Sequence, residues 1–168
     1  MDVPFRYLPV SPTPVKEISP QALEDGIDSP FFDSFKKDYP EFPSWVASLA
    51  DDENNRRIYC IPTPGQNGTQ FAGLAILKLK EPDCVYPLGQ PVSKLCTLKI
   101  ADEFTNKGYA TDLLMVILDE LEDHRSKALY LEVKAEHSDV IEFFLDNDFV
   151  KLTTRDGYED EVVMYRDL

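Results

Sequence analysis

The chain has 168 residues, 43% of them hydrophobic, and its 31 acidic and 17 basic residues give a formal net charge of −14. This length and composition predict one folded domain over residues 1–168 rather than a disordered chain. Nucleic-acid binding is not expected, because neutralising phosphates needs clustered Lys and Arg. A negative surface favours cationic substrates or partners, although it also serves solubility alone.

Signals for membranes, secretion and metal binding are missing from the sequence. No run of about eighteen apolar residues is present, and the N-terminus lacks a charged-then-apolar signal pattern, so we expect a cytoplasmic protein with no membrane partner. The three cysteines form an odd set without metal-ligand spacing. We therefore expect reduced thiols and no bound metal.

Prolines divide the chain into two halves. All thirteen lie at or before Pro91, so the half 1–91 is cut into short pieces, while 92–168 can hold uninterrupted helices and central strands. Apolar runs and turn residues predict the following elements of the first half: an edge strand at 5–10, short helices at 30–35 and 42–49, and strands at 57–61 and 71–79.

The second half alternates strands and helices. Residues 94–100 predict a strand, with Leu95, Thr97 and Lys99 on one face. Apolar residues then recur at helical spacing from 109 to 123. The remaining predicted elements are a buried strand at 128–133, a helix at 138–145 capped by Ser138, and a last strand at 161–165. This order predicts a mixed α/β, or α+β, domain.

The short polar loop before the long helix is a candidate phosphate site. Backbone N–H groups at a helix start lack partners within the helix and lie at the positive end of its dipole. Gly108 allows close backbone approach, Ala110 leaves room, and Lys107 adds positive charge, to which Lys94 and Lys99 could contribute. The signal is weak by itself, because many strand-to-helix turns contain a glycine. The three-glycine dinucleotide pattern and the Walker pattern are both absent.

Two segments resemble motifs of the GNAT acyltransferase superfamily. In its motif A, a strand ending in Val or Ile precedes Gln or Arg, two further residues, Gly, one residue, and Gly or Ala. Ile100 takes the strand end, and the loop positions are filled by Thr105, Asn106, Lys107, Gly108, Tyr109 and Ala110. The segment 137–149 resembles a second motif, with His137 at its Asn, Phe144 at its Tyr and Asp148 at its Gly.

The resemblance implies the GNAT fold: a mostly antiparallel, twisted mixed sheet with helices on both faces and one parallel pair, here 94–100 with 128–133. It implies acetyl-CoA as the cofactor, with pantetheine along the first of these strands and pyrophosphate at the loop amides. The residues implied to bind it are Leu98, Lys99, Ile100, Thr105, Asn106, Lys107, Gly108, Tyr109, Ala110, Thr111, His137 and Phe144.

The implied activity is N-acetyl transfer by direct attack of a bound amine on the thioester, aided by proximity, backbone donors and a base. Two positions depart from the family pattern. Thr105 replaces the usual Arg or Gln, and Phe144 replaces the Tyr that often protonates the leaving thiolate. Two alternatives therefore stay open: a catalytically weak GNAT domain that binds acyl-CoA as a sensor, and a protein-interaction module without a cofactor.

Three side chains are weak candidates for a catalytic role, and each has a plainer interpretation. Cys96 could carry an acyl group, but a strand cysteine is more often a small core residue. His137 could act as a base at neutral pH, or form a loop or cap hydrogen bond. Glu103 could draw a proton from the amine through water, or be an ordinary exposed loop glutamate.

The segment 29–45 is dense in aromatic and acidic residues. In GNAT proteins the region between the first two strands usually forms one wall of the acceptor site, so Asp33, Asp38, Tyr39 and Glu41 could recognise a cationic amine, either a small molecule or a protein amine. Most of the aromatic rings are expected to cover one face of the sheet. The sequence leaves open whether the protein is a monomer or a homodimer.

Overall fold

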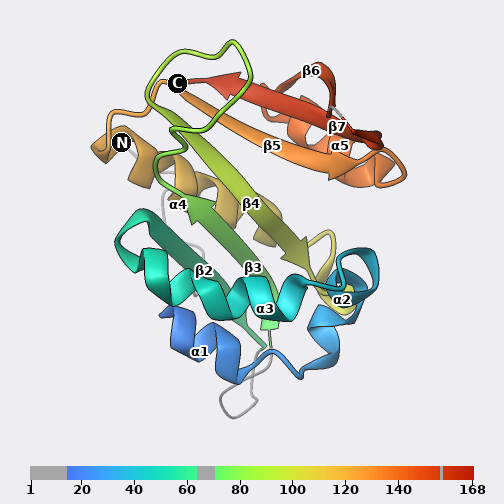
Figure 1. Ribbon diagram of the computed structural model, residues 1–168. Helices are drawn as coiled ribbons and strands as arrows, with labels where there is room; N and C mark the ends of the chain where they lie inside the picture. Colours follow the sequence, from blue (N-terminus) through green and yellow to red (C-terminus); the bar gives the residue numbers. More distant parts are fainter. Residues whose placement is uncertain (1–14, 64–70, 156) are drawn as a thin grey trace, which may run out of the picture.

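The computed structural model describes residues 15–63, 71–155 and 157–168. Its strands form one mixed sheet in the order β1-β2-β3-β4-β5-β7-β6 (Figure 1). The strands are β1 (Lys16–Glu17), β2 (Arg56–Pro62), β3 (Phe71–Lys78), β4 (Val92–Ile100), β5 (Ala128–Lys134), β6 (Val150–Arg155) and β7 (Tyr158–Asp167). Neighbours are antiparallel except for the parallel pair β4–β5, which confirms the predicted fold class.

Helices cover both faces of this sheet. They are α1 (Pro20–Asp25), η2 (Pro30–Phe32), α2 (Asp33–Asp38), α3 (Phe42–Ser48), η3 (Leu49–Asn55), η4 (Asp102–Phe104), α4 (Tyr109–Asp123) and α5 (Ser138–Asp146). Figure 1 shows α1, α2 and α3 in front of the sheet and α4 behind it. The predicted helix 109–123 is confirmed, whereas the predicted strand 5–10 lies outside the described residues.

Two core clusters explain this layering. On one face, the apolar stripe of α4 packs with α5 against β4, β5 and β7, burying residues such as Leu113 and Leu131. On the other face, aromatic rings of η2 and α3, among them Phe31, Phe32 and Phe42, pack against β2 and β3. The interpretation that most aromatic side chains of segment 29–45 form core is therefore confirmed.

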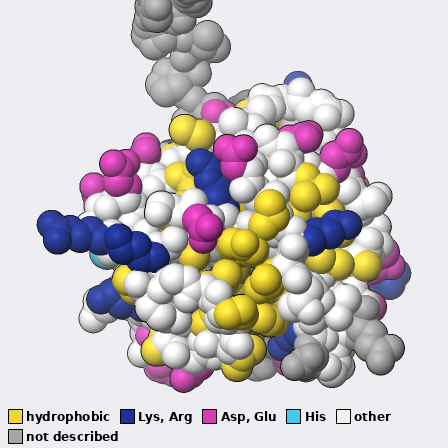
Figure 2. All heavy atoms as spheres, turned by 90° about the horizontal axis from the view of Figure 1, so that it is seen from above, with side chains coloured by type: hydrophobic (Ala, Val, Ile, Leu, Met, Phe, Trp, Pro, Cys, Tyr) yellow, Lys and Arg dark blue, Asp and Glu magenta, His cyan; other side chains and the backbone are white. Residues whose placement is uncertain are grey.

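A third, smaller cluster covers the face of β4, β5 and β7 that is turned away from α4. Loop residues Cys84, Tyr86 and Leu88 pack over Val92, Tyr130 and their neighbours. Figure 2, seen from above, shows hydrophobic side chains gathered in a band on the molecule's upper face. That loop and the C-terminus lie at the top of Figure 1, and Val85 of the loop is 82% exposed.

A β-bulge corrects the predicted facing of residues 94–100. The register between β3 and β4 shifts where Leu77 pairs with Leu95 but Ile76 pairs with Thr97, so Cys96 is the extra residue. Leu95 packs in the α4-side core together with Leu98 and Ile100, and Cys96 packs on the opposite side. The simple alternation expected from the sequence was therefore wrong at this strand.

Within the described residues, no helix is long and apolar enough to cross a membrane.

Candidate functional site

The parallel strands β4 and β5 separate toward their C-terminal ends. They pair only from Val92 to Lys94 and from Ala128 to Tyr130, and Figure 1 shows them diverging beyond that point. Strand β4 continues to pair with β3 as far as Ile100. One edge of its C-terminal half therefore offers backbone donors and acceptors that no described strand uses. The prediction that residues 94–100 and 128–133 form a parallel pair is confirmed.

The loop between β4 and α4 has the geometry of an anion site. Two of its residues are left-handed, Asn106 with φ 62° and Gly108 with φ 82°. The first α-helical bond runs from the Asp112 amide to the Gly108 carbonyl, at 3.0 Å. The amides of the first helical turn, residues 109–111, thus precede the helical hydrogen bonds and remain available to a ligand.

Conformation rather than space explains the glycine in this loop. A Cβ built on Gly108 meets nothing within 4 Å, but the positive φ disfavours other residues. Thr105, Asn106, Lys107 and Gly108 are all exposed, so a ligand can approach them. The open space beside the glycine suits close approach of a bulky group.

Of the three lysines expected to add positive charge at the loop, Lys107 is exposed there, but the other two have partners elsewhere. Lys94 is turned to the other face, where its Nζ lies 2.7 Å from Glu132. Lys99 also points away, with its Nζ donating to the Phe31 carbonyl. These two lysines therefore do not add charge at the loop, and that part of the prediction was wrong.

Comparison with known protein families identifies the family that has this arrangement. A model of the acetyltransferase (GNAT) family matches residues 21–149. The chain belongs to the GNAT acetyltransferase family. Acetyl-CoA is the cofactor of this fold, and the diverging strands and exposed loop amides fit it. A comparison with curated proteins gives no match.

Solved structures show the same fold at low sequence identity. A GNAT-family acetyltransferase from Staphylococcus aureus Mu50 is 14% identical, with a TM-score of 0.70 over 92% of this chain and 99% of that one. PaiA N-acetyltransferase from Thermoplasma acidophilum, in complex with coenzyme A, is 14% identical, with a TM-score of 0.67 over 92% and 98%. Ard1 from Thermoplasma volcanium is 15% identical, with a TM-score of 0.67 over 92% and 96%.

The predicted acceptor residues divide into two groups in this GNAT fold. Asp33 and Glu41 are exposed, and neither forms an ion pair within 4 Å among the described residues. Asp38 and Tyr39 contact residues of β7 and of the segment after β5. The Tyr39 hydroxyl donates to Glu161 Oε1 at 2.6 Å, and Asp38 Oδ2 lies 3.5 Å from His137 Nε2.

Tyr39 belongs to a polar network that sequence reasoning missed. Arg155 joins two carboxylates, with Nη1 2.8 Å from Glu161 and Nε 3.0 Å from Glu132. Glu132 also accepts from Tyr86 at 2.9 Å and pairs with Lys94 at 2.7 Å. The available signal was a charged residue inside the apolar run 128–133, which needs a partner when it is buried.

Burial and neighbouring groups set the pKa values of Glu132 and Tyr39 in this network. Burial alone would raise the pKa of Glu132, but hydrogen bonds from Lys94 and Tyr86 and the nearby Arg155 outweigh it, so the pKa is lowered. Burial and the bond to Glu161 raise the pKa of Tyr39, which keeps its hydroxyl protonated at neutral pH. The Glu132 carboxylate is thus held charged and the Tyr39 phenol neutral.

The three weak catalytic candidates come from different elements, β4, η4 and the start of α5. Glu103 is exposed in η4, and His137 is a half-exposed residue at the start of α5. Burial raises the pKa of the Cys96 thiol, although Arg56 Nη1 lies 3.4 Å from its sulfur. A protonated thiol is a poor nucleophile, which favours the structural interpretation of Cys96.

Phe144 lies in the core rather than at an open surface. Its ring is 2% exposed and meets the Phe143 and Phe149 rings edge-on, at centroid distances of 5.2 and 4.9 Å. Asp148, at the family's glycine position, has a φ of 67°. Asp is among the few residues that tolerate this conformation, so the departure from Gly is accommodated.

Phe144→Tyr is expected to destabilise the protein without raising turnover. The added hydroxyl enters a cluster of buried hydrophobic residues, where a hydroxyl without a partner costs about 1–3 kcal/mol. Urea unfolding and thiol release from acetyl-CoA, measured on one preparation, test this. Increased turnover at unchanged stability would instead place the ring beside the reacting sulfur.

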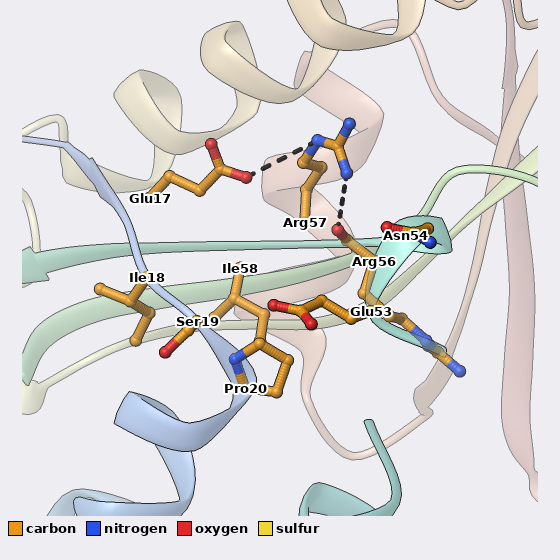
Figure 3. Close-up of a pocket in the computed structure, with 9 residues that line it drawn as sticks. All are labelled: Glu17, Ile18, Ser19, Pro20, Glu53, Asn54, Arg56, Arg57 and Ile58. Atoms are coloured by element: carbon orange, nitrogen blue, oxygen red, sulfur yellow. Dashed lines mark hydrogen bonds and ion pairs between the residues drawn. The ribbon is translucent and has the colours of Figure 1, made fainter. Parts of the chain in front are cut away.

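A hollow at the β1–β2 edge is lined by none of the predicted site residues. Figure 3 shows it lined by Arg56 and Arg57, with Arg57 directed to Glu17 and to the Arg56 carbonyl. Arg57 also pairs with Glu120 at 2.8 Å, and Arg56 pairs with Asp52 at 3.2 Å. Both arginines already have carboxylate partners, so the hollow is not a ready anion site.

Proposed function

We propose that this GNAT protein is an N-acyltransferase that moves an acetyl group from acetyl-CoA to the amine of a cationic acceptor by direct attack. The observation that supports this most is the combination of diverging β4 and β5 with the exposed, left-handed loop before α4. When bound, acetyl-CoA supplies the acyl thioester. The chain's own residues supply positioning.

Each part of the proposed cofactor site has a distinct physical role. The backbone of Leu98–Ile100 offers strand-type hydrogen bonds to the pantetheine arm, because β5 no longer pairs there. The amides of residues 108–111 offer donors to the pyrophosphate, assisted by the helix dipole. The exposed Lys107 adds a charge to offset the phosphates. His137 and Thr111 lie at the starts of α5 and α4, where the family contacts its cofactor.

This site lacks a proton donor at the position where the family often has a tyrosine. Phe144 cannot donate a proton, so water or another group has to protonate the leaving thiolate. Holding the amine near the thioester supplies rate by itself, because proximity replaces a bimolecular encounter. The absence of a phenol at this position also favours a second candidate function, a slow GNAT domain that binds acyl-CoA as a sensor.

Coenzyme A is expected to raise the melting temperature of the protein, since a ligand that binds only the folded state stabilises it by mass action. Acetyl-CoA with a panel of amines is then expected to release free thiol. Binding without thiol release on any amine would favour the sensor. Lack of stabilisation by coenzyme A would contradict both functions and favour a protein-interaction module.

A further inference from the structure

A short segment crosses the sheet on its acceptor side, between the strands that diverge. Residues 31–39, which include α2, are held at one end by β4: Lys99 Nζ donates to the Phe31 carbonyl and, at 2.7 Å, to Ser34 Oγ. The same ammonium faces the rings of Phe31 and Phe35, with centroids at 4.8 and 5.1 Å. We call residues 31–39 the acceptor bridge.

The other end of the acceptor bridge is held by the far strands. The Tyr39 hydroxyl bonds Glu161 of β7 at 2.6 Å, and Lys134 of β5 lies over the Tyr39 ring, 5.4 Å from its centroid. His137, after β5, lies 3.5 Å from Asp38. The segment is thus tied to β4 on one side and to β5 and β7 on the other, across the region where the β4–β5 ladder has ended.

These end contacts hold the bridge in place. Phe31 and Phe32 anchor the first end of the bridge in the core, whereas α2 itself has no fully buried residue, so the Tyr39 end depends more on its polar contacts. Glu161 is 2% exposed and keeps two fixed partners, Tyr39 and Arg155. A bonded pair 2.6 Å apart leaves no passage between the two side chains. Moving the Tyr39 end of the bridge away from β7 therefore requires breaking the Tyr39–Glu161 bond.

From this closure we infer that the acceptor is a small-molecule amine rather than a peptide or protein, and that the Tyr39–Glu161 bond sets this selectivity. The inference rests on the proposed N-acyltransferase activity. A peptide chain has to lie along the acceptor side and continue past the site on at least one end, and the bridge occupies that path. A short amine can reach the strands without displacing it.

The test compares acceptors in one thiol-release assay with acetyl-CoA. The probes are 1,4-diaminobutane, ethanolamine, a hexapeptide with a free N-terminus, and an N-blocked hexapeptide containing one lysine. The wild type is expected to favour the better small amine over either peptide by about 100-fold in kcat/KM. Tyr39→Phe is expected to lower this ratio about tenfold, since a hydrogen bond to a charged group is removed from the closed form.

Tyr86→Phe is the matched control. It also removes a hydroxyl that donates to a network carboxylate, Glu132 at 2.9 Å, but from a loop outside the bridge. Its ratio of small amine to peptide is expected to equal that of the wild type. An equal change in both variants would trace the effect to the network as a whole and overturn the role given to the bridge.

The outcomes separate this inference from the proposed function. Thiol release that is as fast with a peptide as with the small amines would overturn the small-molecule assignment and leave N-acyl transfer standing. A ratio unaffected by Tyr39→Phe would overturn the selectivity role of the Tyr39–Glu161 bond. No thiol release with any acceptor, despite stabilisation by coenzyme A, would instead overturn the acyltransferase activity, and the acceptor assignment with it.

Discussion

Gly108→Asp is expected to abolish the stabilisation of this protein by coenzyme A. The carboxylate would stand beside the free amides at the start of α4 and repel a pyrophosphate bound there. At a ligand concentration 100 times Kd, the wild type gains about 2.7 kcal/mol from binding, and the variant should gain nothing. Melting curves with and without coenzyme A measure this difference.

The variant itself should fold. A Cβ on Gly108 meets nothing within 4 Å, so the expected penalty is the strain of a φ of 82°, about 1 kcal/mol. Gly157→Asp is the matched control, because Gly157 has a φ of 77° in equally open space but lies in the turn between β6 and β7. The control should lose similar stability and keep the response to coenzyme A. An unchanged response in Gly108→Asp would place the phosphate site elsewhere.

The second half of the chain could be predicted well because its signals are local. Helix α4 follows from apolar residues at helical spacing, and its start follows from a glycine that the structure places at a left-handed φ. The cofactor loop is a continuous segment, so its members are neighbours in the sequence as well as in space. Strand β6 was missed because it lies at the sheet edge, where its side chains are mostly exposed and no apolar pattern marks it.

Features that depend on distant partners could not be predicted. Cys96 looks like an ordinary strand residue, and only its register against β3 reveals the bulge. Tyr39 and Glu161 are separated by 122 positions, and no local pattern indicates that they bond. The acceptor residues Asp38 and Tyr39 were selected for their chemistry, but their partners become known only once α2 is placed against β5 and β7.

Glu132→Ala is expected to destabilise the protein by about 3 kcal/mol at pH 7, because removing one member of a buried charge pair leaves the others uncompensated. Glu132 has a side chain only 11% exposed and partners in Lys94 and Arg155. Its loss would leave Lys94 without its carboxylate partner and Arg155 with Glu161 as its remaining one. Urea unfolding of the variant and the wild type measures the difference.

The pH dependence separates this charge effect from a simple loss of packing. The folded-state pKa of Glu132 is lowered from its ordinary value of 4.5, so its stabilising contribution is fully present above that value and is lost as the pH falls through the folded pKa. The gap between wild type and Glu132→Ala should therefore narrow as the pH is taken below about 4.5. Glu122→Ala, at an exposed position of α4, should change stability by less than about 0.5 kcal/mol at either pH. A gap that stays constant with pH would show that the side chain of Glu132 stabilises the sheet by packing, and that Lys94 and Arg155 do not depend on its charge.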